Sequence, residues 1–196
     1  MARGRTGFWA RLGRQAMRFA VLGLVIAASV VVLWLTQPPP FQGRASVADG
    51  DTIEVSGERI RLVGIDAPEF NQQCQADGRA WPCGREATRF LRRMISGREV
   101  ICRPEGTDRF QRVLAECYLG DLSINRTLVA EGWALSFGEF RSEERQAEQD
   151  QKGLWRGTFQ RPSGYRRDNP RVSNVPGLVW GSMRRWFGGS AMGDSL

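Results

Sequence analysis

Residues 47–69 constrain the fold more than any other stretch of the chain. They contain two short β-patterned runs, residues 52–55 and 59–65, with a Ser56-Gly57 pair between them. A turn-forming pair between two β-rich runs is typical of a β-hairpin. We therefore expect the two ends of these runs that lie far from the turn to meet in space.

Charged side chains gather around those far ends. Asp51 precedes the first run, Asp66 and Glu69 follow the second, and Arg61 lies within the second. Carboxylate oxygens are ligands for hard cations, and a guanidinium binds phosphate oxygens. The pattern predicts an oxygen-ligand metal site next to a phosphate site. The alternative is that these side chains only cap turns or lie in solvent.

Composition narrows the chemistry. The 196 residues contain no histidine, which excludes a histidine general base and histidine-ligated zinc. The net charge of +7 comes from the two ends, because residues 49–160 carry a net charge of −3. The high isoelectric point is therefore no argument for nucleic-acid binding.

The four cysteines are consistent with disulfides in an oxidising compartment. They are Cys74, Cys83, Cys102 and Cys117, and their spacing is not that of a zinc site. Three pairings are possible in principle. We expect Cys74–Cys83, which closes a short loop, and Cys102–Cys117, which would join two strands of a second hairpin.

The N-terminal region resembles a membrane anchor. Residues 1–18 are basic, and residues 19–37 form an apolar stretch that we interpret as a transmembrane signal-anchor. Charges on one side only predict a cytoplasmic N-terminus and a domain on the periplasmic or extracellular side of the cell membrane. A cleaved signal peptide, and hence secretion, is the alternative. Residues 38–43 then form a proline-rich linker.

Periodicity predicts alternating strands and helices after the opening hairpin. Apolar residues at helical spacing predict a helix over 84–96, and the β-patterned runs 98–103 and 113–119 predict the second hairpin. Two further helices are expected over 124–131 and 142–152. Residues 161–196 are expected to be a mostly irregular basic tail. Within it, residues 178–187 fit either a basic amphipathic turn on a membrane surface or a disordered segment with exposed aromatics.

The order of several motifs resembles the staphylococcal nuclease, or thermonuclease, family. The motifs are DGDT, RLxGIDAPE, TDRxxR, an INxxLVxEGWA run and a late GLW, and they span residues 44–160. The resemblance implies an α+β fold, a five-stranded OB-like barrel with about three helices. In this chain the predicted transmembrane helix would precede it.

The resemblance also implies roles for individual residues. It implies that Ca²⁺ is held by two carboxylates and a backbone carbonyl, that one carboxylate holds the attacking water, and that two arginines bind phosphate. The matching positions are, in that order, Asp51, Asp66, Ala67, Glu69, Arg61 and Arg112. One departure is Gln111, where the family commonly has glycine; its side chain could alter the aim of Arg112. Asp49 and Asp108 are interpreted as turn and hydrogen-bonding residues.

The function expected from the sequence is a calcium-dependent nuclease that acts on DNA or RNA. It is expected to be exported, anchored to the membrane and monomeric. The alternative is a non-catalytic OB-fold module that binds nucleic acid or protein. The presence of all five acidic and arginine positions favours the enzyme.

Overall fold

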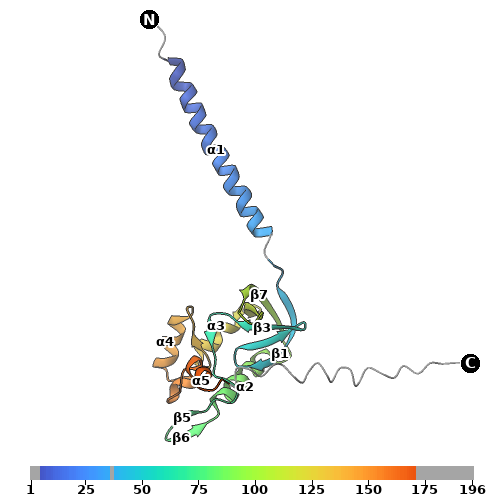
Figure 1. Ribbon diagram of the computed structural model, residues 1–196, viewed down its shortest axis with the longest axis vertical. Coiled ribbons are helices and arrows are strands. Elements are labelled where there is room, and N and C mark those ends of the chain that lie inside the picture. Colours follow the sequence, from blue (N-terminus) through green and yellow to red (C-terminus); the bar gives the residue numbers. More distant parts are fainter. Residues whose placement is uncertain (1–4, 36–37, 171–196) are drawn as a thin grey trace, which may run out of the picture. The chain divides into compact units, whose positions relative to one another are not determined.

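The computed structural model describes residues 5–35 and 38–170. These fall into two units, which divide at Pro39 (Figure 1). The first unit consists of one helix, α1 (Arg5–Leu35). Within the described residues, no helix combines the length and the apolar character needed to cross a membrane. The transmembrane helix predicted over 19–37 is therefore not supported by the described residues.

The second unit contains a closed five-stranded barrel. Its strands are hydrogen-bonded in the order β3-β2-β1-β7-β8, and a parallel pairing between β3 and β8 closes the sheet. This confirms the predicted α+β fold with a five-stranded barrel. The barrel strands are β1 (Phe41–Asp49), β2 (Thr52–Val55), β3 (Glu58–Leu62), β7 (Glu99–Thr107) and β8 (Val113–Leu119). Since β1 begins at Phe41, the last three residues of the predicted linker belong to the barrel.

Shorter strands extend this framework. The strand β9 (Leu122–Ser123) pairs with β8, and β5 pairs with β6 in a separate hairpin. A third small sheet joins β4 to β10, with Asp66 opposite Leu135. The bounds are β4 (Ile65–Asp66), β5 (Cys74–Ala76), β6 (Arg79–Trp81) and β10 (Leu135–Ser136).

The opening hairpin forms as the sequence predicts. Ser56 and Gly57 both have positive φ, 53° and 86°, which is the backbone of the tight turn that matches strand twist. The register pairs Thr52 with Arg61, so the outer ends of β2 and β3 lie side by side. The buried side chains alternate along β2 and β3, and they contribute Ile53, Val55, Ile60 and Leu62 to the barrel core.

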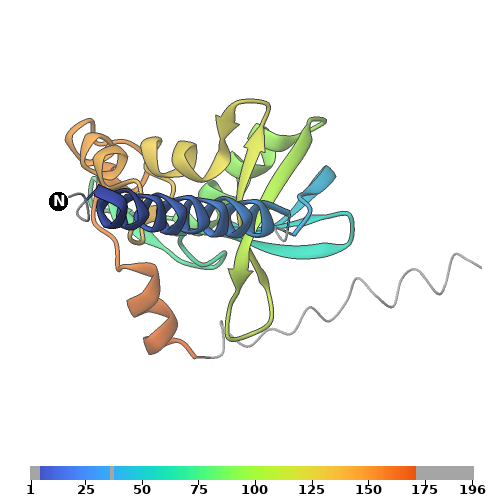
Figure 2. The same cartoon turned by 90° about the horizontal axis from the view of Figure 1, so that it is seen from above.

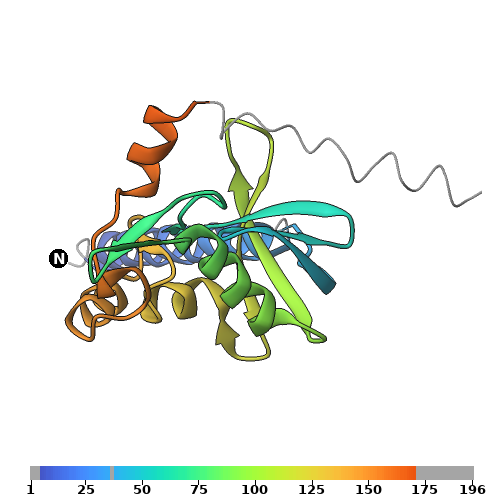
Figure 3. The same ribbon diagram turned by 90° about the horizontal axis from the view of Figure 1, so that it is seen from below.

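Helices cover the barrel and the small sheets. The helix α2 packs against β1 (Figure 3), and α3 packs against β8 and α4 (Figure 2). The bounds are α2 (Cys83–Ile95), α3 (Ile124–Ala130), α4 (Arg141–Gln149), the short 3₁₀ helix η1 (Gly153–Arg156) and α5 (Pro162–Asp168). The first three match the predicted helices. The helix α5 was not expected, because it lies in the segment 161–196 that we predicted to be mostly irregular. Residues 178–187 lie outside the described residues.

Both expected disulfides are present. Cys102 lies directly opposite Cys117 in the β7–β8 pairing, so this bridge crosses two barrel strands. Cys74 and Cys83 join β5 to the start of α2. These two cysteines pack with Leu135 and Leu154 in a second, smaller core outside the barrel. One bridge thus braces the barrel and the other braces the segment beside it.

Candidate active site

Asp51 is fixed at the start of β2 by a close approach between two turns. A Cβ added at Gly50 would lie 2.9 Å from the Cβ of Ala67, so the chain fits there because residue 50 has no side chain. Asp51 is only 5% exposed. Its Oδ1 accepts a hydrogen bond from the Thr52 hydroxyl at 3.0 Å. The burial of a carboxylate with so few neutral partners requires a cation nearby.

Asp49 supports this turn rather than the ion site itself. Its Oδ1 accepts a hydrogen bond from the Asp51 amide at 3.1 Å, in agreement with the predicted turn role. Burial, with the charge of Asp51 adding to it, raises the pKa of Asp49 to about 7. At neutral pH Asp49 is therefore partly protonated, which lessens its repulsion of Asp51.

Arg61 holds the two aspartates of the hairpin together. Its Nη1 lies 2.9 Å from Oδ2 and 3.0 Å from Oδ1 of Asp51, and its Nη2 lies 3.5 Å from Oδ1 of Asp66. Asp66 is 7% exposed and is set in place by the β4–β10 pairing. The proximity of Asp51 and Asp66 that the hairpin predicts is therefore present, with an arginine between them.

Glu69 joins this cluster through a residue that the sequence did not single out. Arg166, in α5, donates from Nη1 to Oε1 of Glu69 at 2.9 Å and from Nη2 to Oδ1 of Asp66 at 2.8 Å. Burial lowers the pKa of Arg166, but the hydrogen bonds and charges of Asp66 and Glu69 outweigh that effect and raise the pKa above its ordinary value. Arg166 is therefore a permanent cation between the two carboxylates.

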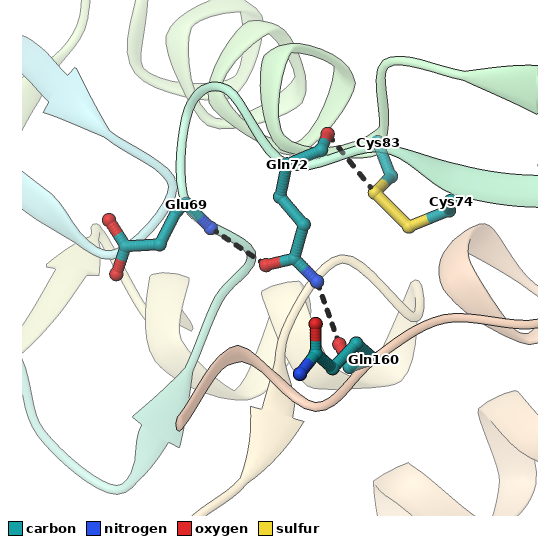
Figure 4. The surroundings of a disulfide bond; sticks show 5 residues. All are labelled: Glu69, Gln72, Cys74, Cys83 and Gln160. Atoms are coloured by element: carbon teal, nitrogen blue, oxygen red, sulfur yellow. Dashed lines mark hydrogen bonds between the residues drawn. A yellow bond between two sulfur atoms is a disulfide. The ribbon is translucent and has the colours of Figure 1, made fainter. Parts of the chain in front are cut away.

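Gln72 fixes the loop that carries Glu69. Its side chain is fully buried; Oε1 accepts from the Glu69 amide at 3.2 Å, and Nε2 donates to the Gln160 carbonyl at 2.7 Å. The Gln72 carbonyl in turn lies 3.4 Å from Sγ of Cys83. Figure 4 shows these contacts and shows the Glu69 carboxylate pointing away from Gln72. Gln72 thus connects the Glu69 loop, the outer disulfide and the segment before α5.

Gly84 lets α2 approach the same loop. A Cβ added there would lie 1.8 Å from the Glu69 carbonyl oxygen, a distance that no real structure tolerates. The first turn of α2 and the backbone of Glu69 are therefore in direct contact. A larger residue at position 84 would have to move Glu69 away from its present place.

Arg112 is held by its own turn rather than by the acidic cluster. Its Nε and Nη2 both lie 2.7 Å from Oδ2 of Asp108, and Oδ1 of Asp108 accepts the Arg112 amide at 3.0 Å. Burial raises the pKa of Asp108, but the hydrogen bonds and charge of Arg112 and the Phe110 amide outweigh it and hold the pKa below its ordinary value. Asp108 has the turn role that we predicted.

The parallel β3–β8 pairing brings Arg112 to the hairpin. Val113, the next residue, pairs with Ile60, which precedes Arg61. The backbone of Arg112 therefore lies next to β3. Gln111, the residue directly before Arg112, has a φ of +62°, in the left-handed region that favours glycine. The departure at position 111 thus falls on a residue whose backbone is strained by its side chain.

The donor set fits a hard divalent cation only in part. The described residues contain no group of three or more acidic, cysteine or histidine side chains arranged to hold a metal. Two nearly buried carboxylates, Asp51 and Asp66, do share one arginine, and the buried Ala67 follows Asp66 with its amide 3.5 Å from Oδ2 of Asp51. Two carboxylates, a carbonyl and water are a suitable oxygen shell for Ca²⁺.

Comparison with known proteins connects this cluster to a family. The family model described as staphylococcal nuclease homologue matches residues 59–157. The chain belongs to the staphylococcal nuclease family. The match includes Arg61, Asp66, Glu69 and Arg112, whereas Asp51 and Arg166 lie outside it.

The matches with individual relatives cover most of the length of each relative. A succinoglycan biosynthesis protein of Rhizobium meliloti is 36% identical over 155 residues, which cover 75% of this chain and 80% of that protein. An uncharacterized endonuclease of Escherichia coli is 32% identical over 120 residues, 56% of this chain and 72% of the relative. A thermonuclease of Staphylococcus intermedius is 30% identical, with coverages of 57% and 76%. The named nucleases among them support a hydrolytic nuclease function.

Two residues of the site were missed by sequence reasoning. Gln72 carries no motif or periodic pattern, and nothing in a single sequence shows that its side chain is buried. Arg166 was placed in the mostly irregular tail; Pro162, the first residue of the segment PSGYRRD, was the available sign of a helix. Both act over long sequence separations, 88 residues for Gln72 to Gln160 and 97 for Arg166 to Glu69.

Proposed function

We propose that this protein is a calcium-dependent nuclease that hydrolyses phosphodiester bonds in DNA or RNA. The observation that carries the proposal is the contact of Arg61 with both Asp51 and Asp66. It supports an acidic cation site with a phosphate-binding guanidinium next to it. Membership of a nuclease family supports the reaction type.

Each residue has a separate task in this proposal. Asp51, Asp66 and the Ala67 carbonyl would hold Ca²⁺, which supplies positive charge for the charge that develops on the phosphate oxygens. Glu69 orients a water molecule and takes its proton as the water attacks phosphorus. Arg61 donates to phosphate oxygens with its planar fork and stays charged at any working pH.

Arg112 would supply the second guanidinium to the phosphate. It now donates to Asp108, and the two groups form a pair at the edge of the barrel. A phosphate at the β3–β8 junction would accept from Arg61 on β3 and from Arg112, which directly precedes β8. The two arginines would hold the scissile phosphate from two sides, so that water attacks phosphorus in a fixed geometry.

The proposed location is outside the reducing cytoplasm. Two disulfides, Cys74–Cys83 and Cys102–Cys117, use all four cysteines of the chain. Such bridges persist in oxidising compartments. We therefore propose that the domain is exported. Anchoring by the predicted span is not included in this proposal.

A non-catalytic binding module is the competing function. A module that only binds has no need for Glu69, whose carboxylate is directed to the acidic site by Gln72 and Arg166. In such a module the buried aspartates would lower the stability of the fold without serving a function. The combination of three carboxylates with Arg61 in one cluster favours hydrolysis.

Cleavage by the full chain tests the proposal. Plasmid DNA and a long RNA are incubated with wild-type protein in Ca²⁺ or in chelator, and with Glu69→Gln in Ca²⁺. The matched control is Glu58→Gln, an exposed glutamate at the start of β3. We expect cleavage by wild type and Glu58→Gln in Ca²⁺ only, and a loss of about 100-fold or more for Glu69→Gln. Binding of both polymers without cleavage under any condition would favour the module.

A further inference from the structure

Arg166 binds two of the three carboxylates that we assign to catalysis. The two contacts, 2.8 Å to Oδ1 of Asp66 and 2.9 Å to Oε1 of Glu69, use both terminal nitrogens of the guanidinium. The same Oδ1 of Asp66 also lies 3.5 Å from Arg61. Arg166 comes from α5, which lies beyond the residues that match the family model.

The position of α5 does not depend on Arg166 alone. The preceding segment is fixed by Gln72, which donates to the Gln160 carbonyl, and by backbone pairing of Gln75 with Thr158 at 2.9 and 2.8 Å. Gly157 makes this pairing possible, because a Cβ there would lie 2.0 Å from the Gln75 carbonyl oxygen. Pro162 at the start of α5 is buried. These contacts therefore hold α5 in a position where the guanidinium of Arg166 lies at the acidic site.

Charge makes this contact incompatible with a metal ion at the same oxygens. Arg61 and Arg166 bring two positive charges to Asp51, Asp66 and Glu69. A divalent cation bound through Asp66 would lie next to the guanidinium of Arg166 and repel it. The carboxylate of Glu69 is also occupied, so it has one oxygen fewer with which to hold water.

We propose that Arg166 is an internal counter-ion of the acidic site, which a divalent cation must displace before the site can work. Arg166 and α5 thereby set the affinity of the protein for the metal. This inference rests on the proposed function for the place of the metal. The role of α5 is opposite to that of Asp51 and Asp66, because those two residues would hold the ion and α5 competes with it.

Calorimetric titration of Ca²⁺ into the full chain measures this competition. The variants are Arg166→Gln, which removes the guanidinium, and Arg167→Gln, which removes the same charge from an exposed neighbour on α5. We expect the dissociation constant for Ca²⁺ to fall about 5- to 50-fold in Arg166→Gln, since two charge-assisted hydrogen bonds no longer compete. Arg167→Gln should change it by less than about 2-fold.

Two results would overturn the proposal. The first is an unchanged or weaker Ca²⁺ affinity in Arg166→Gln, accompanied by a higher KM for DNA, which would make Arg166 a third phosphate ligand. The second is an equal gain in affinity from Arg167→Gln, which would reduce the effect to net charge. Absence of Ca²⁺ binding by all three chains would also contradict it.

A measurement on the wild-type protein covers the case in which Arg166→Gln does not fold. The Nε–H signal of Arg166 in a ¹⁵N NMR spectrum reports whether its side chain is held. We expect it to shift and exchange faster as Ca²⁺ is added, whereas a signal unaffected at saturating Ca²⁺ would overturn displacement. Cleavage assays on the same samples separate the two proposals. Tighter Ca²⁺ binding by Arg166→Gln without any cleavage would refute the nuclease and keep the counter-ion.

Discussion

Arg61 lies on barrel strand β3 and Asp51 lies directly before β2, whereas Glu69 and Arg166 lie on segments outside the barrel. The barrel side of the site is fixed by local pairing, with Thr52 opposite Arg61 across a two-residue turn. The outer side is fixed by contacts between distant residues, such as Gln72 with Gln160. A sheet ladder positions side chains through many equivalent hydrogen bonds, but the outer side relies on a few individual ones. The two halves should therefore respond differently to substitution.

Removal of the barrel arginine should have the largest effect. Arg61→Gln deletes the group that contacts both aspartates, and we expect the cleavage rate to fall about 100- to 1000-fold, as for loss of a transition-state donor. The control is Arg59→Gln, which lies on the same strand two residues earlier and is exposed. It should retain near wild-type rates in the same assay. Equal losses in both variants would show that general charge, not the Arg61 contact, matters.

A substitution that displaces only the outer side of the site should have the second-largest effect on the cleavage rate. Gly84→Ala forces a methyl group against the Glu69 carbonyl, and we expect about a 100-fold lower cleavage rate from the displaced carboxylate. Ca²⁺ affinity should change much less, because Asp51 lies on the barrel. The control is Gly164→Ala in α5, where the added Cβ would meet nothing closer than 3.6 Å. A Gly84→Ala protein with wild-type rates would mean that Glu69 does not depend on this packing.

The two disulfides offer a direct comparison of the halves. One double variant, Cys102→Ala/Cys117→Ala, removes the disulfide of the barrel. The other, Cys74→Ala/Cys83→Ala, removes the disulfide outside it. Each loss should lower the unfolding free energy by roughly 3 kcal/mol. Below their melting temperatures, the barrel variant should cleave within about 2-fold of wild type, and the outer variant should lose about 10-fold, because Glu69 loses its support. Denaturant unfolding and cleavage on the same samples check this. The reverse order of activities would refute the division into two halves.

The smallest effect is expected at the turn that presents Arg112. Gln111→Gly relieves the left-handed strain but gives the unfolded chain more freedom, so we expect a net gain of about 0.5–1 kcal/mol in unfolding free energy. Thermal denaturation measures it. Gln149→Gly, in the exposed face of α4, should instead lose about 1 kcal/mol. A destabilised Gln111→Gly would mean that the Gln111 side chain makes a contribution that outweighs the strain.

The barrel side could be predicted from the sequence because its determinants are local. The Ser56-Gly57 turn, the alternation in β2 and β3, and the cross-strand Cys102–Cys117 pair all follow from short spacings. The outer side could not be predicted in the same way. The burial of Gln72, the contact of Gly84 with Glu69 and the delivery of Arg166 to Asp66 each depend on how separate segments pack. The helix α5 is the clearest case, since a short polar sequence is stabilised there by tertiary contacts.

The membrane span predicted over residues 19–37 stays a prediction. Hydropathy along residues 19–37 pointed to an anchor, but no helix among residues 5–35 and 38–170 has both the length and the apolar character that a span requires. The cysteine pattern was more informative, because both predicted bridges are present.

The calcium dependence of single-turnover DNA cleavage tests the central claim most directly. Wild type, Asp51→Asn and the control Asp121→Asn, at an exposed turn, are compared over a range of Ca²⁺ concentrations and in chelator. We predict no cleavage in chelator, coincident calcium curves for wild type and Asp121→Asn, and a curve shifted more than about 10-fold to higher Ca²⁺ for Asp51→Asn, which loses one ligand charge. Wild-type cleavage that persists in chelator, or an Asp51→Asn curve that overlays the wild type, would contradict the account.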